Sequence, residues 1–166
     1  MKYEIIYPTE EDINKMDRIA VRLFGEADTN MAEPNIENAR KLISLEKNNS
    51  ICFKDGDDPI AWSAVLPTSK KDMVDFLDRK LSERDLFEKS IASPSFEALY
   101  LFVVVVMPDY RKQGLGISLI KHQIKYFQDK YNIKDFYAWA FSPEGEKLIL
   151  SLQKDLSMDI SYIRKV

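Results

Sequence analysis

Hydrophobic positions along the chain follow two different spacings. Short apolar or β-rich runs bounded by turn residues predict strands over residues 3–7, 50–54, 60–67, 96–106, 135–141 and 158–166. Apolar residues at helical spacing predict helices over residues 10–25, 35–48, 68–92, 115–131 and 142–155. This order predicts one mixed α/β domain over residues 1–166, with a central mixed sheet of about six or seven strands flanked by helices.

Helix starts are marked by capping residues. Thr9 and Asp12 form the Ser/Thr-x-x-acid pattern of a capping box, and the apolar face of the helix that follows holds Ile13, Met16, Ile19, Ala20 and Leu23. Ser82 and Asp85 form a second pattern of this kind, which can split the segment 68–92 into two helices. Ser142 followed by Pro143 favours a helix start at that position.

The most apolar stretch of the chain, residues 99–107, is hydrophobic at both alternating positions, which is typical of a central strand buried on both faces. Pro108 ends it. A basic turn with Arg111, Lys112, Gly114 and Gly116 then precedes a helix. The first amides of a helix lack partners, and glycines let a ligand approach them, so this turn predicts an anion site suited to a pyrophosphate. The alternative is a purely structural tight turn.

Two common phosphate loops are excluded by the residues after Gly116. A Walker A loop needs Gly-Lys-Ser/Thr, whereas Ile117 follows Gly116, and a dinucleotide turn needs a third glycine where Leu119 stands.

Composition excludes several other classes. The 166-residue chain has a net charge of −3 and a pI near 5.3, which argues against a nucleic-acid binder. Cys52 is the sole cysteine, so a disulfide within the chain and a cysteine-based metal cluster are excluded. His122 is the sole histidine, so Ser-His and Cys-His catalytic pairs are excluded unless His122 is the base. The longest apolar run is too short to span a membrane, and no signal peptide is evident, so we expect a cytoplasmic protein.

The segment "VVMPDYRKQGLGISLI" resembles the acetyl-CoA-binding motif of the GNAT acetyltransferase superfamily. That motif is a strand ending Val-x-Pro, then Arg/Gln-x-x-Gly-x-Gly/Ala, then a helix. Val106-Met107-Pro108 and Arg111-Lys112-Gln113-Gly114-Leu115-Gly116 match every specified position. The order of predicted elements agrees with the family over nearly the whole chain. The resemblance implies a GNAT-like acyltransferase fold with acetyl-CoA as co-substrate and no metal.

The resemblance also implies roles for individual residues. The backbone of Val104, Val105 and Val106 would pair with the pantetheine arm of the cofactor. Arg111 and the amides of Lys112, Gln113, Gly114, Leu115, Gly116 and Ile117 would hold the pyrophosphate. The strand 135–141 would splay from the central strand. Ser142 stands where the family often has a cofactor-binding Asn. Ile149 stands where many members have a Tyr that protonates the leaving thiolate.

Candidate catalytic residues are fewer and rest on position alone. Glu97, at the start of the central strand, is a candidate base, and Tyr100 and Tyr137, on adjacent predicted strands, are candidate proton donors. We expect His122 to face solvent. The acidic groups Asp55-Asp57-Asp58 and Glu83-Asp85 are interpreted as solvated turns.

The leading hypothesis is therefore an acetyl-CoA-dependent N-acetyltransferase in which the primary amine of a small molecule or peptide attacks the thioester directly. Ile149 motivates an alternative, a non-catalytic CoA-binding or regulatory module on the same fold. A third possibility is an interaction domain that binds no nucleotide. We expect no nucleic-acid or membrane partner. The last strand, 158–166, could pair with a second copy in a homodimer.

Overall fold

The computed structural model describes residues 2–25, 31–32 and 35–165. Its centre is a five-stranded sheet in the order β1-β2-β3-β4-β5. The strands are β1 (Ser50–Asp55), β2 (Asp58–Thr68), β3 (Ala98–Val106), β4 (Asp135–Ala140) and β5 (Ser161–Arg164). β1, β2 and β3 are antiparallel, whereas β3, β4 and β5 are parallel. The prediction of a mixed sheet is thereby confirmed.

The expected strand count is slightly too high. Residues 3–7 do not form a strand, because they meet the sheet only through a single antiparallel bridge between Ile6 and Cys52. Both hydrogen bonds of that bridge are 2.9 Å long. The last strand also begins at Ser161 rather than at residue 158. Strand-forming residues alone therefore do not make residues 3–7 a strand, because this segment pairs with β1 at a single residue.

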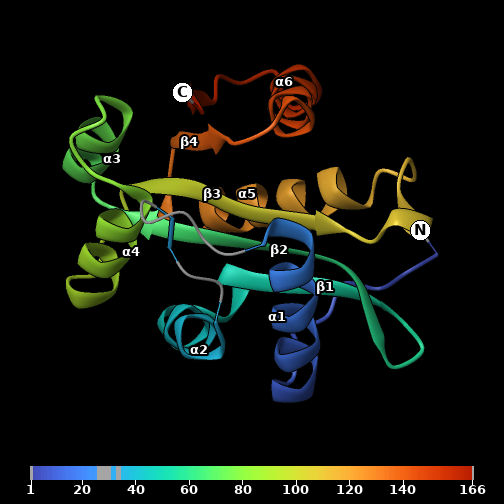
Figure 1. The fold of residues 1–166 in the computed structure, drawn as a ribbon. Coiled ribbons are helices and arrows are strands. Elements are labelled where there is room, and N and C mark those ends of the chain that lie inside the picture. Colours follow the sequence, from blue (N-terminus) through green and yellow to red (C-terminus); the bar gives the residue numbers. More distant parts are fainter. Residues whose placement is uncertain (1, 26–30, 33–34, 166) are drawn as a thin grey trace.

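Six α-helices surround the sheet within the described residues (Figure 1). They are α1 (Glu10–Phe24), α2 (Ile36–Leu45), α3 (Lys70–Leu77), α4 (Glu83–Ala92), α5 (Leu115–Tyr131) and α6 (Pro143–Leu156), with short 3-10 turns η1 (Lys47–Asn49) and η2 (Pro108–Tyr110). Figure 1 shows α1 and α2 on one side of the sheet and α6 on the other. Leu99 and Leu101 of β3 pack with α5 and α6, and Tyr100 packs with α3 and α4.

Helix starts agree with the capping signals. Thr9 and Asp12 form the capping box of α1, and Ser82 with Asp85 forms that of α4, so the segment 68–92 is two helices. Ser142 caps α6 by accepting a hydrogen bond from the Gly145 amide. One detail of the predicted face of α1 is wrong: Leu23 is 42% exposed, because the core side of the helix ends at Ala20.

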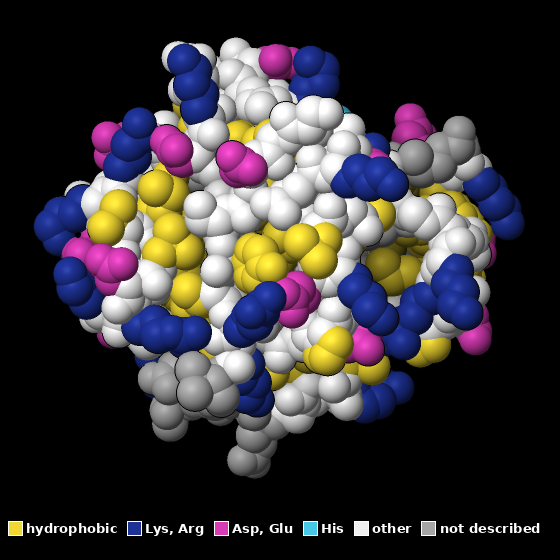
Figure 2. Space-filling view, turned by 90° about the horizontal axis from the view of Figure 1, so that it is seen from above, with side chains coloured by type: hydrophobic (Ala, Val, Ile, Leu, Met, Phe, Trp, Pro, Cys, Tyr) yellow, Lys and Arg dark blue, Asp and Glu magenta, His cyan; other side chains and the backbone are white. Residues whose placement is uncertain are grey.

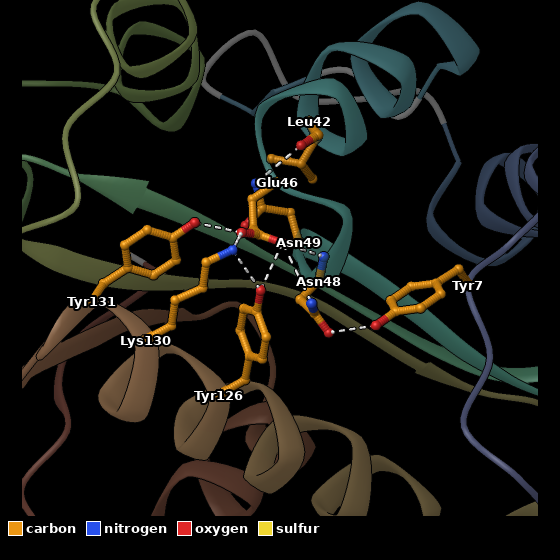
Figure 3. A network of polar contacts seen from close by, with 8 residues as sticks. All are labelled: Tyr7, Leu42, Glu46, Asn48, Asn49, Tyr126, Lys130 and Tyr131. Atoms are coloured by element: carbon orange, nitrogen blue, oxygen red, sulfur yellow. Dashed lines mark hydrogen bonds and ion pairs between the residues drawn. The ribbon is translucent and has the colours of Figure 1, made fainter.

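A carboxylate cluster ties α5 to the segment that joins α2 and β1 (Figure 3). Glu46, which is 7% exposed, accepts hydrogen bonds from Tyr131, Lys130, Tyr126 and Asn48. We call this set the Glu46 cluster. Hydrogen bonds from these residues take the place of water around the buried Glu46 carboxylate. Removing the carboxylate would therefore leave several donors without an acceptor.

In the described part of the chain, no helix has the length and apolar character needed to cross a membrane.

Candidate functional site

The turn after β3 leads into α5, the only one of the described α-helices that lacks a side-chain cap. The N-cap of α5 is Gly114, and the first hydrogen bond of the helix runs from the Ser118 amide to the Gly114 carbonyl at 3.0 Å. The amides that precede Ser118 therefore have no partner within the helix. Lys112 and Gly114 both adopt positive φ, 63° and 72°, which bends the chain sharply around these amides. The result is a helix N-terminus open to an anion.

Gly116 has a separate, structural reason to be glycine. A Cβ at this position would lie 3.0 Å from Cγ1 of Val104 and 3.4 Å from Cγ2 of Val106. The glycine therefore lets the first turn of α5 lie against the C-terminal half of β3. By contrast, a Cβ at Gly114 would meet nothing within 4 Å, so the space beside that residue is open.

Positive charge surrounds this turn. Arg111 and Lys112 are exposed, and no carboxylate among the described residues pairs with either. Arg111 folds back over the strand end, where its Nε donates to the Val106 carbonyl at 3.2 Å. Figure 2 shows Lys and Arg side chains around a hydrophobic hollow near the end of the molecule where β3 stops. Together with the open amides, these cations favour phosphate groups.

The strands on either side of this site part from each other. β3 pairs with β2 from Ala98 to Val106, but with β4 only from Ala98 to Leu101. Beyond Leu101, the edge of β3 that faces β4 is unpaired. A bulge lies at the same point, because Leu101 and Val103 oppose consecutive residues of β2 and Phe102 opposes none. The edge of β3 that faces β4 beyond Leu101 is therefore open to a ligand.

A cleft of about 210 Å³ occupies the gap between β3 and β4. Its walls come from both sides of the sheet and are mostly apolar. The described lining residues are Ala20, Phe24, Gly25, Met31, Ala32, Glu83, Leu101, Phe102, Val103, Val104, Ile120, Ala138, Trp139, Phe141, Ser142, Gly145, Leu148, Ile149 and Leu152. The cleft thus connects the α5–α6 side of the sheet with the side covered by α1 and α4.

Solved structures share the fold of this chain, although its sequence matches no family model and no curated protein. Diaminobutyrate acetyltransferase EctA from Paenibacillus lautus, in complex with diaminobutyric acid and coenzyme A, superposes with a TM-score of 0.60 at 13% identity, over 94% of this chain and 77% of that one. An aminoglycoside acetyltransferase from an uncultured soil sample, in complex with sisomicin, gives 0.58 at 14% identity, over 99% and 94%. The protein has the GNAT acetyltransferase fold.

Other structures with this fold extend well beyond the present chain. The loading GNATL domain of CurA from Lyngbya majuscula matches with a TM-score of 0.59 at 16% identity, over 89% of this chain and 69% of that one. The chain spans only 42% of a putative acetyltransferase from Pyrococcus horikoshii, which it matches with a TM-score of 0.57 at 12% identity and over 91% of its own length.

Within this GNAT fold, several predicted cofactor residues come together. Val104 lines the cleft, and Val105 and Val106 continue the unpaired edge of β3 towards the turn. Gln113 is exposed beside Lys112, Leu115 and Gly116 are buried beneath the turn, and Ile117 is partly exposed. Ser142 lines the opposite wall, where its Oγ accepts from the Gly145 amide at 3.1 Å.

Two further groups in the wall bear on the chemistry. Ile149 is buried and lines the cleft, so an aliphatic side chain occupies the place expected for a phenol. The indole Nε1 of Trp139 is buried and has no hydrogen-bond partner among the described residues. It is a donor that a carbonyl in the cleft would satisfy.

The three predicted catalytic residues do not line the cleft. Glu97 is exposed before β3, at the far end of that strand from the turn, and accepts from Ser95 Oγ at 3.0 Å. Tyr100 and Tyr137 are neighbours on β3 and β4, as expected, and both are buried. The hydroxyl of Tyr137 bonds Thr68 Oγ1 at 2.7 Å. His122 is exposed, as expected.

Glu83 corrects one expectation outright. The interpretation of Glu83 as part of a solvated turn is wrong, because its side chain is only 6% exposed and lines the cleft. Its Oε2 accepts from the Tyr100 hydroxyl at 2.5 Å and its Oε1 from the Ala32 amide at 3.1 Å. The local pattern gave no signal for this burial, because an acidic residue in the first turn of a helix is usually solvated and favoured there by the helix dipole.

Proposed function

We propose that the protein is an N-acetyltransferase that transfers the acetyl group of acetyl-CoA to a primary amine. The observation that carries the proposal is the unpaired edge of β3 beyond Leu101, which leads directly into the uncapped N-terminus of α5. An extended arm attached to a pyrophosphate needs these two features side by side.

The proposed cofactor site uses backbone groups for most of its contacts. The pantetheine arm pairs with the edge of β3 at Val104, Val105 and Val106 in the manner of an added strand. The amides of the turn from Lys112 to Ile117 hold the pyrophosphate, and Arg111 adds charge. Ser142 and the indole of Trp139 supply polar contacts from the opposite wall.

The proposed reaction places the thioester at the β3 bulge. A backbone amide on the edge of β3 beyond Leu101, where β4 provides no partner, polarises the thioester carbonyl. The neutral amine attacks the carbonyl carbon, the C–N bond forms, and collapse of the tetrahedral intermediate breaks the C–S bond. No phenol is present among the described lining residues, so the proton that the nitrogen loses on amide formation passes to the thiolate, directly or through water.

The amine acceptor is supported by the related structures rather than by residues of this chain alone. EctA holds the diamine diaminobutyric acid, and the soil-sample acetyltransferase holds the aminoglycoside sisomicin. We infer a small-molecule or peptide amine here too. A CoA-dependent reaction and a buried free thiol at Cys52 both suit the cytoplasm.

Thiol release tests this proposal. Acetyl-CoA is mixed with the protein and a panel of primary amines, and free CoA is followed while mass spectrometry detects the acetylated amine. The proposal predicts amine-dependent release of CoA together with the acetylated product. Tight binding of acetyl-CoA with no amine-dependent release contradicts it and favours the non-catalytic module that Ile149 suggests.

A further inference from the structure

Glu83 occupies an unusual place in the cleft. It is the only ionisable side chain among the described residues of the lining, and the walls around it are apolar. A carboxyl that is 6% exposed in such surroundings is costly unless hydrogen bonds or a counter-charge compensate it. Its position therefore calls for a partner beyond the protein's own donors.

The hydrogen bonds to Glu83 leave room for that partner. Tyr100 donates to Oε2 and the Ala32 amide donates to Oε1. A carboxylate has about four acceptor positions, so about two remain. No Lys or Arg lines the cleft among the described residues, so no protein cation takes them there. An ammonium group, with three N–H donors, can use the acceptor positions that Tyr100 and Ala32 leave open on the Glu83 carboxylate.

The cleft passes between β3 and β4, and its two walls determine which groups can meet beside Glu83. Leu148, Ile149 and Leu152 form the wall on the α6 side, where the proposed cofactor arm runs along β3. Glu83 and Ala32 form the wall on the other side, beside α1 and α4. The thioester at the bulge would thus be reached from one side of the sheet by the cofactor arm. An amine held by Glu83 would approach the thioester carbonyl from the other side.

We propose that Glu83 binds the ammonium group of the acceptor and accepts its proton, and that the acceptor is a primary monoamine with an apolar stem. The proposal rests on the proposed acetyltransferase function. One carboxylate matches one ammonium group, and the apolar walls match a hydrocarbon stem rather than a polycation.

The proton balance is complete without a further reactant. The bound ammonium group gives one proton to the Glu83 carboxylate and becomes a neutral amine. Attack forms the C–N bond and breaks the C–S bond, and a second proton passes from nitrogen to the thiolate, directly or through water. Glu83 then returns its proton to solvent, so the products are the amide, CoA thiol and one proton.

The titration of Glu83 suits this role. Burial raises its pKa to about 7, although the hydrogen bonds from Tyr100 and the Ala32 amide act in the lowering direction. Tyr100 is the titratable group in contact with it, and burial raises the pKa of Tyr100 well above its usual range, so the phenol stays protonated. Above about pH 7 Glu83 is therefore a carboxylate that can accept a proton.

The first test compares the parent protein with the Glu83→Gln variant. Calorimetric binding of acetyl-CoA should be the same for both, which establishes that the cofactor site is intact. With hexylamine as acceptor, kcat/KM at pH 7.5 should fall by at least about 100-fold in the variant. The parent's kcat/KM should level off above about pH 7. The variant's should keep rising into alkaline pH, where hexylamine deprotonates by itself.

Matched tyrosine variants separate a proton-transfer role from a structural one. Tyr100→Phe removes a hydrogen bond that favours the Glu83 carboxylate, so the acidic limb of the pH profile should move to higher pH. Tyr137→Phe removes a buried hydroxyl bonded to Thr68 instead, so the limb should stay in place. Equal displacement in both variants, or none in Tyr100→Phe, overturns the role of Glu83.

The acceptor class is tested with the parent protein on hexylamine, benzylamine and spermine. The proposal predicts higher kcat/KM for the two monoamines than for the tetraamine. Binding of acetyl-CoA without turnover of either monoamine, or a clear preference for spermine, overturns the proposed acceptor while leaving the cofactor site standing. Failure to bind acetyl-CoA at all would instead remove the proposed function on which this inference rests.

Discussion

The Glu46 cluster gives a stability prediction whose size follows from the structure. The carboxylate of Glu46 accepts from Tyr131, from Lys130 at 3.0 Å and from the Asn48 amide at 3.2 Å (Figure 3). Burial alone would raise the pKa of Glu46, but these hydrogen bonds outweigh it and lower the pKa from its ordinary value of 4.5 to about 2. The folded state therefore favours the charged form.

That shift translates into a free energy of unfolding. A pKa lowered from 4.5 to about 2 corresponds to about 3 kcal/mol at pH 7. Glutamine resembles the uncharged carboxylic acid, so Glu46→Gln should destabilise the protein by about this amount and lower Tm by roughly 6–12 °C for a domain of this size. Urea unfolding followed by circular dichroism measures the difference.

The pH dependence has a definite sign. Because the folded pKa is the lower one, the contribution is fully present above about pH 4.5 and is lost as pH falls towards 2. The difference between parent and Glu46→Gln should shrink to about 1.4 kcal/mol at pH 3.

Glu37→Gln is the matched control, since Glu37 lies on α2 in an exposed ion pair with Lys41 and should change stability by no more than about 0.5 kcal/mol. A Glu46→Gln effect below 1 kcal/mol, or one independent of pH, would refute the reasoning.

Three further predictions concern single sites. Ser142→Ala removes the cap of α6 and should cost about 1 kcal/mol in urea unfolding; no loss would mean that the Gly145 amide finds another acceptor. Gly116→Ala should lower the free energy of unfolding by about 1–3 kcal/mol, because the alanine Cβ would lie 3.0 Å from Cγ1 of Val104. An unchanged Tm would show that β3 can shift without cost to accommodate the extra methyl group. Burial raises the pKa of Cys52 to about 12, so a thiol reagent at pH 8 should label it only after unfolding; rapid labelling of the native protein would contradict that burial.

Local signals predicted much of the fold. Residues 115–131 were expected to be helical from their spacing, and α5 has these bounds. Thr9 with Asp12, and Ser82 with Asp85, set helix starts through bonds between residues three apart, which need no knowledge of the rest of the chain. The turn after β3 was also predicted, because its glycines and cations act through backbone geometry and charge that are local.

Contacts between residues far apart in the chain could not be predicted from the sequence. Glu83 looks like any acidic residue in a first helical turn, and only the packing of α4 against β3 brings it to Tyr100. Gln123 on α5 is likewise buried, since Ser63 donates to it at 2.7 Å and it donates to the Asn48 carbonyl at 2.8 Å. Polar residues with distant partners carry no periodic signal, so the place of Glu83 in the wall of the cleft could not be predicted from the sequence.

The central claim is that the turn before α5 binds the pyrophosphate of acetyl-CoA, and calorimetric titration with acetyl-CoA tests it most directly. Gly114→Trp fills the open space beside the turn, and Gly56→Trp is the matched control, because Gly56 also has positive φ with nothing within 4 Å but lies in the β1–β2 turn. The account predicts equal affinity for the parent and Gly56→Trp and binding at least about ten-fold weaker for Gly114→Trp, a loss of about 1.4 kcal/mol. No binding by the parent, or undiminished binding by Gly114→Trp, would contradict it.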